Sequence, residues 1–173
     1  MEPPVSSTPP SLELPADLRA RFDARELASF AIEAIHRVKP GSSTFLHNGQ
    51  MFSESMLLTV LTYCYAIGVY ASSEVEQTIQ DDETVRYLCA RVFPDSEDLR
   101  QFRRRNASLI KHGLIQLFAI ADHKFNSGSD GYLTYATVSL GQTFAAGRAW
   151  EFAAEADRRV TRAIQADSIA MDA

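Results

Sequence analysis

The chain has 173 residues, of which 46% are hydrophobic and 23% are charged, and its formal net charge is −5 at pH 7. This composition is typical of a single soluble domain with enough apolar residues for a core. It excludes a collagen-like repeat, a disordered tail and a small disulfide-rich scaffold. An acidic chain does not bind nucleic acids through its bulk charge, so any contact with DNA needs a local basic patch.

Neither a membrane span nor a secretion signal is expected. The most apolar window, residues 56–70, contains threonines and a glycine and is shorter than the ~20 apolar residues that a span requires. The first residues, MEPPVSSTPPS, contain no basic region and no apolar region, which predicts a cytoplasmic protein, associated with the nucleoid if it binds DNA. Cys64 and Cys89 lie in apolar surroundings without metal-ligand spacing, so we expect buried free thiols.

The N-terminal part is predicted to be an arm followed by a helix. Residues 1–15 are rich in proline and serine, which favours a flexible arm outside the core. From residue 16 to Val38, apolar side chains recur mostly at three- and four-residue steps, as in an amphipathic helix, until Pro40 and Gly41 end it. Residues 41–50 are expected to form a polar connection.

The middle of the chain predicts three further helices with short breaks between them. Ser53 is expected to cap a strongly apolar helix, the best candidate for the centre of the core. Ser73 and Glu76 have the spacing of a capping box at the start of the next helix. Asp82 is expected to cap a third helix, which Pro94 ends.

A basic helix is predicted next. Asp98 and Gln101 have capping-box spacing at its start, and Gly113 is expected to kink or split it. After the loop NSGSDG, residues 132–140 favour either a strand or the start of a helix, and residues 145–170 form an alanine-rich helix.

The fold class that we predict is mainly α, a multi-helix bundle with a helix-turn-helix-like DNA-binding unit and a long C-terminal helix. We divide the chain into three parts, which are the arm (1–15), a helical domain (16–125), and a loop, vestigial strand and C-terminal helix (126–173).

Positive charge is concentrated in residues 86–112. This segment holds seven basic and three acidic residues, a local charge of +4, so the rest of the chain carries −9. We expect Arg100, Arg103 and Arg104 to point their guanidinium groups to solvent while Phe102 points to the core. Two helices joined by a Phe-Pro-Asp turn favour a helix-turn-helix-like unit that contacts DNA. A solvated helix face with local salt bridges accounts for the same charges equally well.

No catalytic motif or metal-binding motif is present. The four histidines lie on separate segments, and neither a phosphate-binding glycine loop nor a nucleophile elbow occurs. The acidic triplet at residues 81–83 precedes a helix, where carboxylates stabilise the helix N-terminus. We therefore expect a protein that is not an enzyme and has no catalytic residue, no metal and no cofactor.

The order of motifs in residues 52–105 resembles the N-terminal (InsH-like) domain of bacterial insertion-sequence transposases of the DDE type. The matching pieces are MLLTVLTYCYAIGVY, SSEVE, VRYL, FPD and LRQFRRRN. The resemblance implies a helical domain that recognises double-stranded DNA at transposon ends and helps transposase subunits associate. The residues expected to contact DNA are Arg91, Arg100, Arg103, Arg104, Arg105 and Lys111.

Three positions depart from the family pattern. Ser73 stands where the family commonly has arginine, and Asp98 stands where threonine is common, so both changes weaken the inference of tight DNA binding. Gly141 aligns with the first metal-binding aspartate of the family. Since two-metal phosphoryl transfer needs acidic oxygens, the resemblance implies a catalytically inactive relative.

Two functions are compatible with these observations. The first is a DNA-binding and association module, whose partners are double-stranded DNA and either a second copy or a full-length transposase, with no membrane contact. The alternative is a helical protein–protein interaction or oligomerisation module, or a decayed transposase fragment, without DNA binding. The two differ in whether the arginine face is open to solvent or occupied by the chain's own carboxylates.

Overall fold

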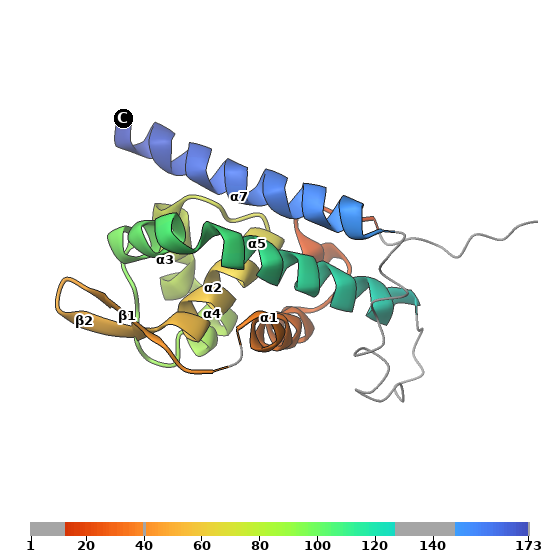
Figure 1. The fold of residues 1–173 in the computed structure, drawn as a ribbon, viewed down its shortest axis with the longest axis horizontal. Helices are drawn as coiled ribbons and strands as arrows, with labels where there is room; N and C mark the ends of the chain where they lie inside the picture. The colour runs from red at the N-terminus through yellow and green to blue at the C-terminus, as the bar shows by residue number, and fades with distance from the viewer. Residues whose placement is uncertain (1–12, 40, 127–147, 173) are drawn as a thin grey trace, which may run out of the picture.

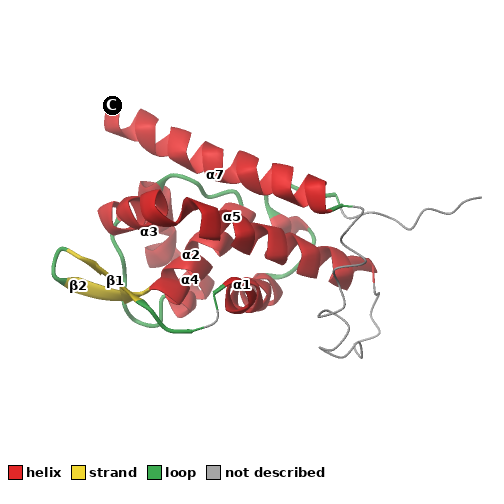
Figure 2. Ribbon diagram, in the orientation of Figure 1, coloured by secondary structure: helices red, strands yellow, loops and turns green. Residues whose placement is uncertain are grey.

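The computed structural model describes residues 13–39, 41–126 and 148–172, which form a mainly helical fold with a long C-terminal helix, as expected, and one two-stranded sheet (Figure 2). The elements are η1 (Leu18–Ala20), α1 (Ala24–Val38), β1 (Thr44–His47), β2 (Gln50–Ser53), α2 (Glu54–Ala66), α3 (Ser72–Asp81), α4 (Glu83–Leu88), α5 (Ser96–Asn126) and α7 (Ala149–Asp172). The long helix α5 packs against α1, α2 and α7, and α7 runs along one side of it (Figure 1).

The helix expected from residue 16 begins only at Ala24. The 3-10 turn η1 precedes it, and the chain turns near Phe22, where the apolar pattern makes a five-residue step. Asp23 then caps α1, because its carboxylate accepts a hydrogen bond from the Glu26 amide at 2.9 Å and the Glu26 carboxylate accepts one from the Asp23 amide at 3.3 Å. Ile32, expected on the buried stripe, is 46% exposed.

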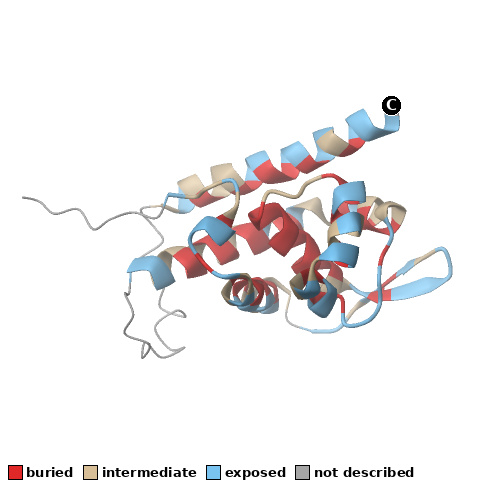
Figure 3. Cartoon of the chain, turned by 180° about the vertical axis from the view of Figure 1, so that it is seen from behind, coloured by how far each residue is buried: buried red, intermediate tan, exposed pale blue. Residues whose placement is uncertain are grey.

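Residues 41–50, expected to be a polar connection, instead contribute to a β-hairpin. β1 and β2 pair antiparallel, with Phe45 opposite Phe52. Asn48 and Gly49 at the turn both have positive φ, 49° and 78°, as a type I′ hairpin turn requires. The two phenylalanines are buried, whereas the tip of the hairpin is exposed (Figure 3).

α2 is the central helix of the core. Ser53 caps it as predicted, since its hydroxyl accepts a hydrogen bond from the Met56 amide at 3.3 Å. Every residue from Leu57 to Ala66 is buried, so this part of α2 is covered on all sides, as in a helix at the centre of a core. Gly68 follows with a φ of +86°, and a Cβ there would lie 2.9 Å from the carbonyl oxygen of Ala16.

Gly113 lets α5 approach α1 and α2 closely. The sequence suggested a kink at this glycine, but it is helical and buried, and the non-helical residue inside α5 is Asn106. A Cβ on Gly113 would lie 2.6 Å from Ile35 Cδ1 and 2.8 Å from Thr62 Oγ1. Close contact among three helices therefore depends on the missing side chain.

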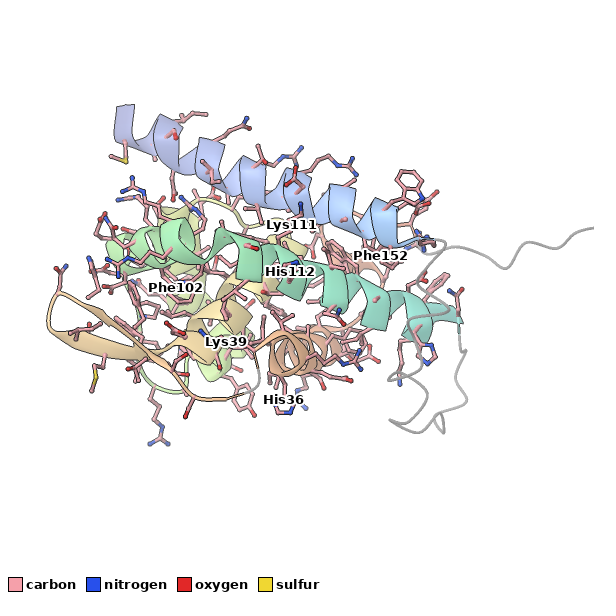
Figure 4. The ribbon with its side chains drawn as sticks, viewed as in Figure 1. His36, Lys39, Phe102, Lys111, His112 and Phe152 are labelled. Carbon is pink, nitrogen blue, oxygen red and sulfur yellow. The ribbon has the colours of Figure 1, made fainter. Side chains whose placement is uncertain are left out.

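α7 shares the core of the preceding helices. Phe152, Ala156 and Ala163 are buried in the same apolar cluster as α2 and α5. Figure 4 shows Phe152 between α7 and α5, where its ring lies 6.3 Å from that of Phe118. Trp150, at the start of α7, is 70% exposed. The described part of residues 126–173 thus packs on the helical domain that precedes it.

Arg159 ties α7 to the end of α2. Its side chain is 2% exposed, and its Nη1 donates hydrogen bonds to the carbonyl oxygens of Tyr65 and Ala66 at 2.9 Å each. Nη2 donates to the carbonyl oxygen of Pro15 at 2.6 Å, and Nε donates to Glu155 at 2.8 Å. One guanidinium therefore satisfies the last carbonyls of the central helix and holds the N-terminal segment.

The cysteines lie within the described residues, whereas part of the segment after α5 does not. Cys64 and Cys89 are buried and free, as predicted. The strand or helix start at residues 132–140, and Gly141, lie outside the described residues. Among the described helices, none has the length and apolar content needed to cross a bilayer.

Candidate nucleic-acid interface

The basic segment runs through α4, a loop and the first half of α5. Asp82 caps α4 as predicted, but α4 ends at Leu88, earlier than expected. The connecting loop, residues 89–95, is longer than the three- or four-residue turn typical of a helix-turn-helix motif. Within it, Ala90 and Arg91 have positive φ values of 50° and 70°, which are uncommon for residues other than glycine.

The cap of α5 lies three residues before the position expected for it. Asp95 is the capping residue, because its carboxylate accepts a hydrogen bond from the Asp98 amide at 2.8 Å. In return, the Asp98 carboxylate accepts a hydrogen bond from the Asp95 amide at 3.0 Å. The other oxygen of Asp98 lies 2.5 Å from Nδ1 of His47. The prediction that Asp98 caps this helix was wrong, and its buried carboxylate instead fixes the hairpin to the first turn of α5.

A second contact holds the hairpin on α5. The rings of Phe45 and Phe102 meet edge to face, with 5.2 Å between their centroids. The guanidinium of Arg105 lies over the same Phe45 ring, 5.5 Å from its centroid. The hairpin and the arginines of α5 are therefore fixed relative to one another.

Arg103 is buried, which contradicts the expectation that its guanidinium points to solvent. Its side chain is 3% exposed, and its Nη1 lies 2.5 Å from Oδ2 of Asp167 in α7. The same nitrogen donates to the hydroxyl of Ser72 at 3.3 Å. A guanidinium enclosed between helices cannot reach a phosphate, so Arg103 is a structural residue and leaves the set of DNA contacts.

The carboxylate of Asp167 also holds the start of α3. It accepts hydrogen bonds from the Ser72 amide and the Ser72 hydroxyl, both at 2.7 Å. Burial alone would raise the pKa of Asp167, but the bonds from Ser72 and the ion pair with Arg103 outweigh it and hold this pKa below its ordinary value. The capping box expected at Ser73 and Glu76 is absent, because α3 begins at Ser72 and Glu76 instead accepts the Ser96 amide at 2.9 Å.

Two more of the predicted cations are paired with carboxylates. Arg100 forms an ion pair with Glu97, and its Nε lies 3.8 Å from Asp167. Nζ of Lys111 lies 3.2 Å from Asp157, across the seam between α5 and α7. Figure 4 shows Lys111 on the side of α5 that faces α7.

Of the predicted DNA contacts on α5, Arg104 and Arg105 are exposed. Both side chains lie at the surface, and neither forms an ion pair with any carboxylate in residues 13–39, 41–126 and 148–172. His112, exposed and two turns further along, faces outward on the same helix (Figure 4). The predicted arginine face is thus reduced to two adjacent open residues.

Arg91 does not join this pair. It lines a groove bounded by α1, the start of α2 and α4, and no residue of α5 lines that groove. Of the six predicted DNA contacts, the structure therefore leaves Arg104 and Arg105 open on α5, engages Arg100, Arg103 and Lys111 with acids, and places Arg91 on a different surface.

Sequence reasoning missed the residues that position the two open arginines. His47 and Phe45 fix the hairpin, and their signal was the Asn48-Gly49 pair between two short runs with apolar residues. Asp167 gave no local signal, because it lies 64 residues after Arg103 in the sequence. Across the described part of the chain, no cluster of three or more His, Cys, Asp or Glu residues has the geometry to hold a metal ion.

Comparison of the chain with protein-family models, with curated proteins and with solved structures found no match.

Proposed function

We propose that this protein is a DNA-binding and association module, related to transposase N-terminal domains and without catalytic activity. One observation carries the proposal. Arg104 and Arg105 are neighbouring, exposed guanidinium groups that form no ion pair with a described carboxylate, whereas Arg100, Arg103 and Lys111 of the same helix are paired with acids. Arginine pairs with phosphate in two parallel hydrogen bonds, so an adjacent open pair suits the backbone of duplex DNA.

The hairpin supports this proposal through its fixed position. Its tip carries Asn48, Gly49 and Gln50, which are all exposed and uncharged, and its strands are held to α5 through His47 and Phe102. Amide side chains and backbone amides both donate to phosphate oxygens. Because the hairpin is fixed to α5, its tip and the arginine pair keep one relative position, which lowers the ordering cost of binding.

The resemblance of residues 52–105 to the transposase N-terminal domain supports duplex DNA at transposon ends as the ligand class. It also supports a second copy of the chain or a full-length transposase as a protein partner. The inactivity that we propose rests on the sequence alone, because Gly141 lies outside the described residues. The helix-turn-helix interpretation stays part of the proposal and is not needed for the arginine contacts.

A helical interaction module without DNA binding is the second candidate. The observation that favours it is the engagement of Arg100, Arg103 and Lys111 by the chain's own acids. A face that is half neutralised has less attraction for phosphate than the sequence suggests. In that case the paired cations serve to hold α7 on α5, and the function lies on another surface.

The experiment that separates the two is fluorescence anisotropy with labelled duplexes cut from the flanks of the gene's own locus, at low salt. The Arg104→Ala/Arg105→Ala variant is compared with Arg21→Ala/Arg25→Ala, which removes the same charge from exposed arginines near the start of α1. We expect at least a tenfold loss of affinity in the first variant and little change in the second. Equal losses, or no binding by a folded wild-type protein, would leave the interaction module as the function.

A further inference from the structure

A groove lies between α1, the first turns of α2 and α4. Its volume is about 980 Å³, and it is open to solvent. His36, near the end of α1, lies on the side of that helix away from α7 (Figure 4). The groove shares no lining residue with the arginine pair of α5, so its function is independent of the DNA contacts proposed above.

The rim of the groove is basic on an acidic protein. Lys39, Arg86 and Arg91 line it against the single acid Glu83, which gives a local charge of +2 with His36 neutral and leaves −7 for the rest of the chain. Lys39 is paired with Glu54, and Arg86 donates to the carbonyl oxygens that end α3. Arg91 has no ion pair with any described carboxylate, so it is the cation most available to a ligand.

The walls of the groove present large apolar side chains to solvent. Tyr87 is 74% exposed, Phe93 is 50% exposed and Ile32 is 46% exposed, and all three line the groove together with Met56. Aromatic residues, methionine and arginine are the types enriched at protein–protein interfaces. A soluble chain that keeps several of them together at one surface presents a binding site.

The loop that carries Arg91 is held in an uncommon conformation. Ala90 and Arg91 are consecutive non-glycine residues with positive φ, 50° and 70°. Such backbone persists only where the surroundings impose it, and it is concentrated at binding sites. Here it sets Arg91 and Phe93 on the same rim, one charged and one apolar.

We propose that this groove binds an acidic, amphipathic peptide segment of a partner protein. A carboxylate of the peptide pairs with Arg91, and two or three of its apolar side chains pack on Tyr87, Phe93 and Ile32. Charge complementarity decides the choice of occupant, because a basic rim on a chain of net charge −5 selects an acidic ligand. The apolar walls offer nothing to the sugar and phosphate surface of a duplex.

The test is selection of a random 12-residue peptide library, displayed on phage, against the immobilised full chain. We expect the enriched peptides to carry net negative charge and at least two large apolar residues. A fluorescein-labelled copy of the most enriched peptide should bind the wild-type chain and lose at least tenfold in affinity with Arg91→Glu or with Tyr87→Ser. Both side chains are exposed, so both variants should fold. Arg21→Glu, an exposed arginine outside the groove, is the matched control and should bind normally.

Four results would overturn the proposal. They are a library with no enrichment, enriched peptides without acidic bias, peptide binding that Arg91→Glu leaves intact, and DNA binding that Arg91→Glu abolishes. Sedimentation of the free chain tests whether a second copy of the chain occupies the groove. A dimer that Tyr87→Ser dissociates would also overturn the proposal, because the ligand would then be a second copy. Failure of DNA binding in the anisotropy experiment leaves the groove proposal unaffected, because the two sites share no residue.

Discussion

Arg103 in α5 and Asp167 in α7 form a buried ion pair, with 2.5 Å between Nη1 and Oδ2 and side-chain exposures of 3% and 4%. Because the same carboxylate accepts two hydrogen bonds from Ser72, α3, α5 and α7 meet at one acidic side chain. This junction decides which arginines of α5 are structural and which are open to a ligand.

Replacing Arg103 tests its structural role. Arg103→Met leaves the carboxylate of Asp167 buried without its cation, so we expect a loss of about 3–5 kcal/mol in the free energy of unfolding. Arg104→Met removes an exposed cation of the same helix, and we expect a change within about 0.5 kcal/mol. Urea unfolding followed by circular dichroism measures both, and equal small effects would show that the Arg103 ion pair contributes little.

The pH dependence of stability follows from Asp167. Its pKa in the folded chain lies below its ordinary value of 3.8, so the folded state binds protons less readily than the unfolded state. The resulting stability is fully present above about pH 5 and is lost as the pH falls through the folded pKa. We expect Asp167→Asn to unfold more easily at pH 7 and to show a flatter decline in acid. A decline as steep as that of the wild type would assign the acid sensitivity to other carboxylates.

Gly113 is predicted to be intolerant of a side chain. Gly113→Ala raises helix propensity by about 1 kcal/mol, but its Cβ would lie 2.6 Å from Ile35 Cδ1. We therefore expect a net destabilisation of about 1–3 kcal/mol from overpacking. Ile35→Val removes the Cδ1 atom, so a double-mutant cycle by urea unfolding should show favourable coupling between the two changes. Additive effects would contradict the close contact.

The two cysteines should be chemically silent in the folded protein. Burial raises the pKa of both thiols, that of Cys89 to about 11, and both side chains are 0% exposed. Since the thiolate is the reactive form, we expect no reaction with Ellman's reagent near pH 8 and two thiols per chain after unfolding in urea. Rapid reaction of one thiol in the folded state would show that this thiol is accessible to solvent, which contradicts its burial.

The parts of the fold set by local sequence could be predicted, and the parts set by distant partners could not. Ser53 and Asp82 cap their helices as expected because a cap needs only the amides of the next turn. Asp98 misled the prediction for α5 because Asp95 has the same chemistry one turn earlier. The hairpin was predictable from Asn48-Gly49, a signal strong enough to outweigh the polar composition around it.

The candidate site was predictable only in outline. The sequence located the basic helix, but periodicity could not tell Arg103 from Arg104, because the acid that buries Arg103 comes from α7. Arg159 shows the same limit, since its partners Pro15 and Tyr65 are remote in sequence. An arginine in a helix gains a structural role through tertiary contacts that no local pattern encodes.

The salt dependence of DNA binding tests the central claim most directly. Each phosphate contact contributes about 0.9 to the slope of log K against log salt concentration. We predict that Arg104→Ala/Arg105→Ala lowers the magnitude of this slope by about 2, whereas the charge-matched Arg21→Ala/Arg25→Ala variant leaves it unchanged. A slope that both variants reduce equally, or that neither reduces, would contradict a DNA interface at Arg104 and Arg105.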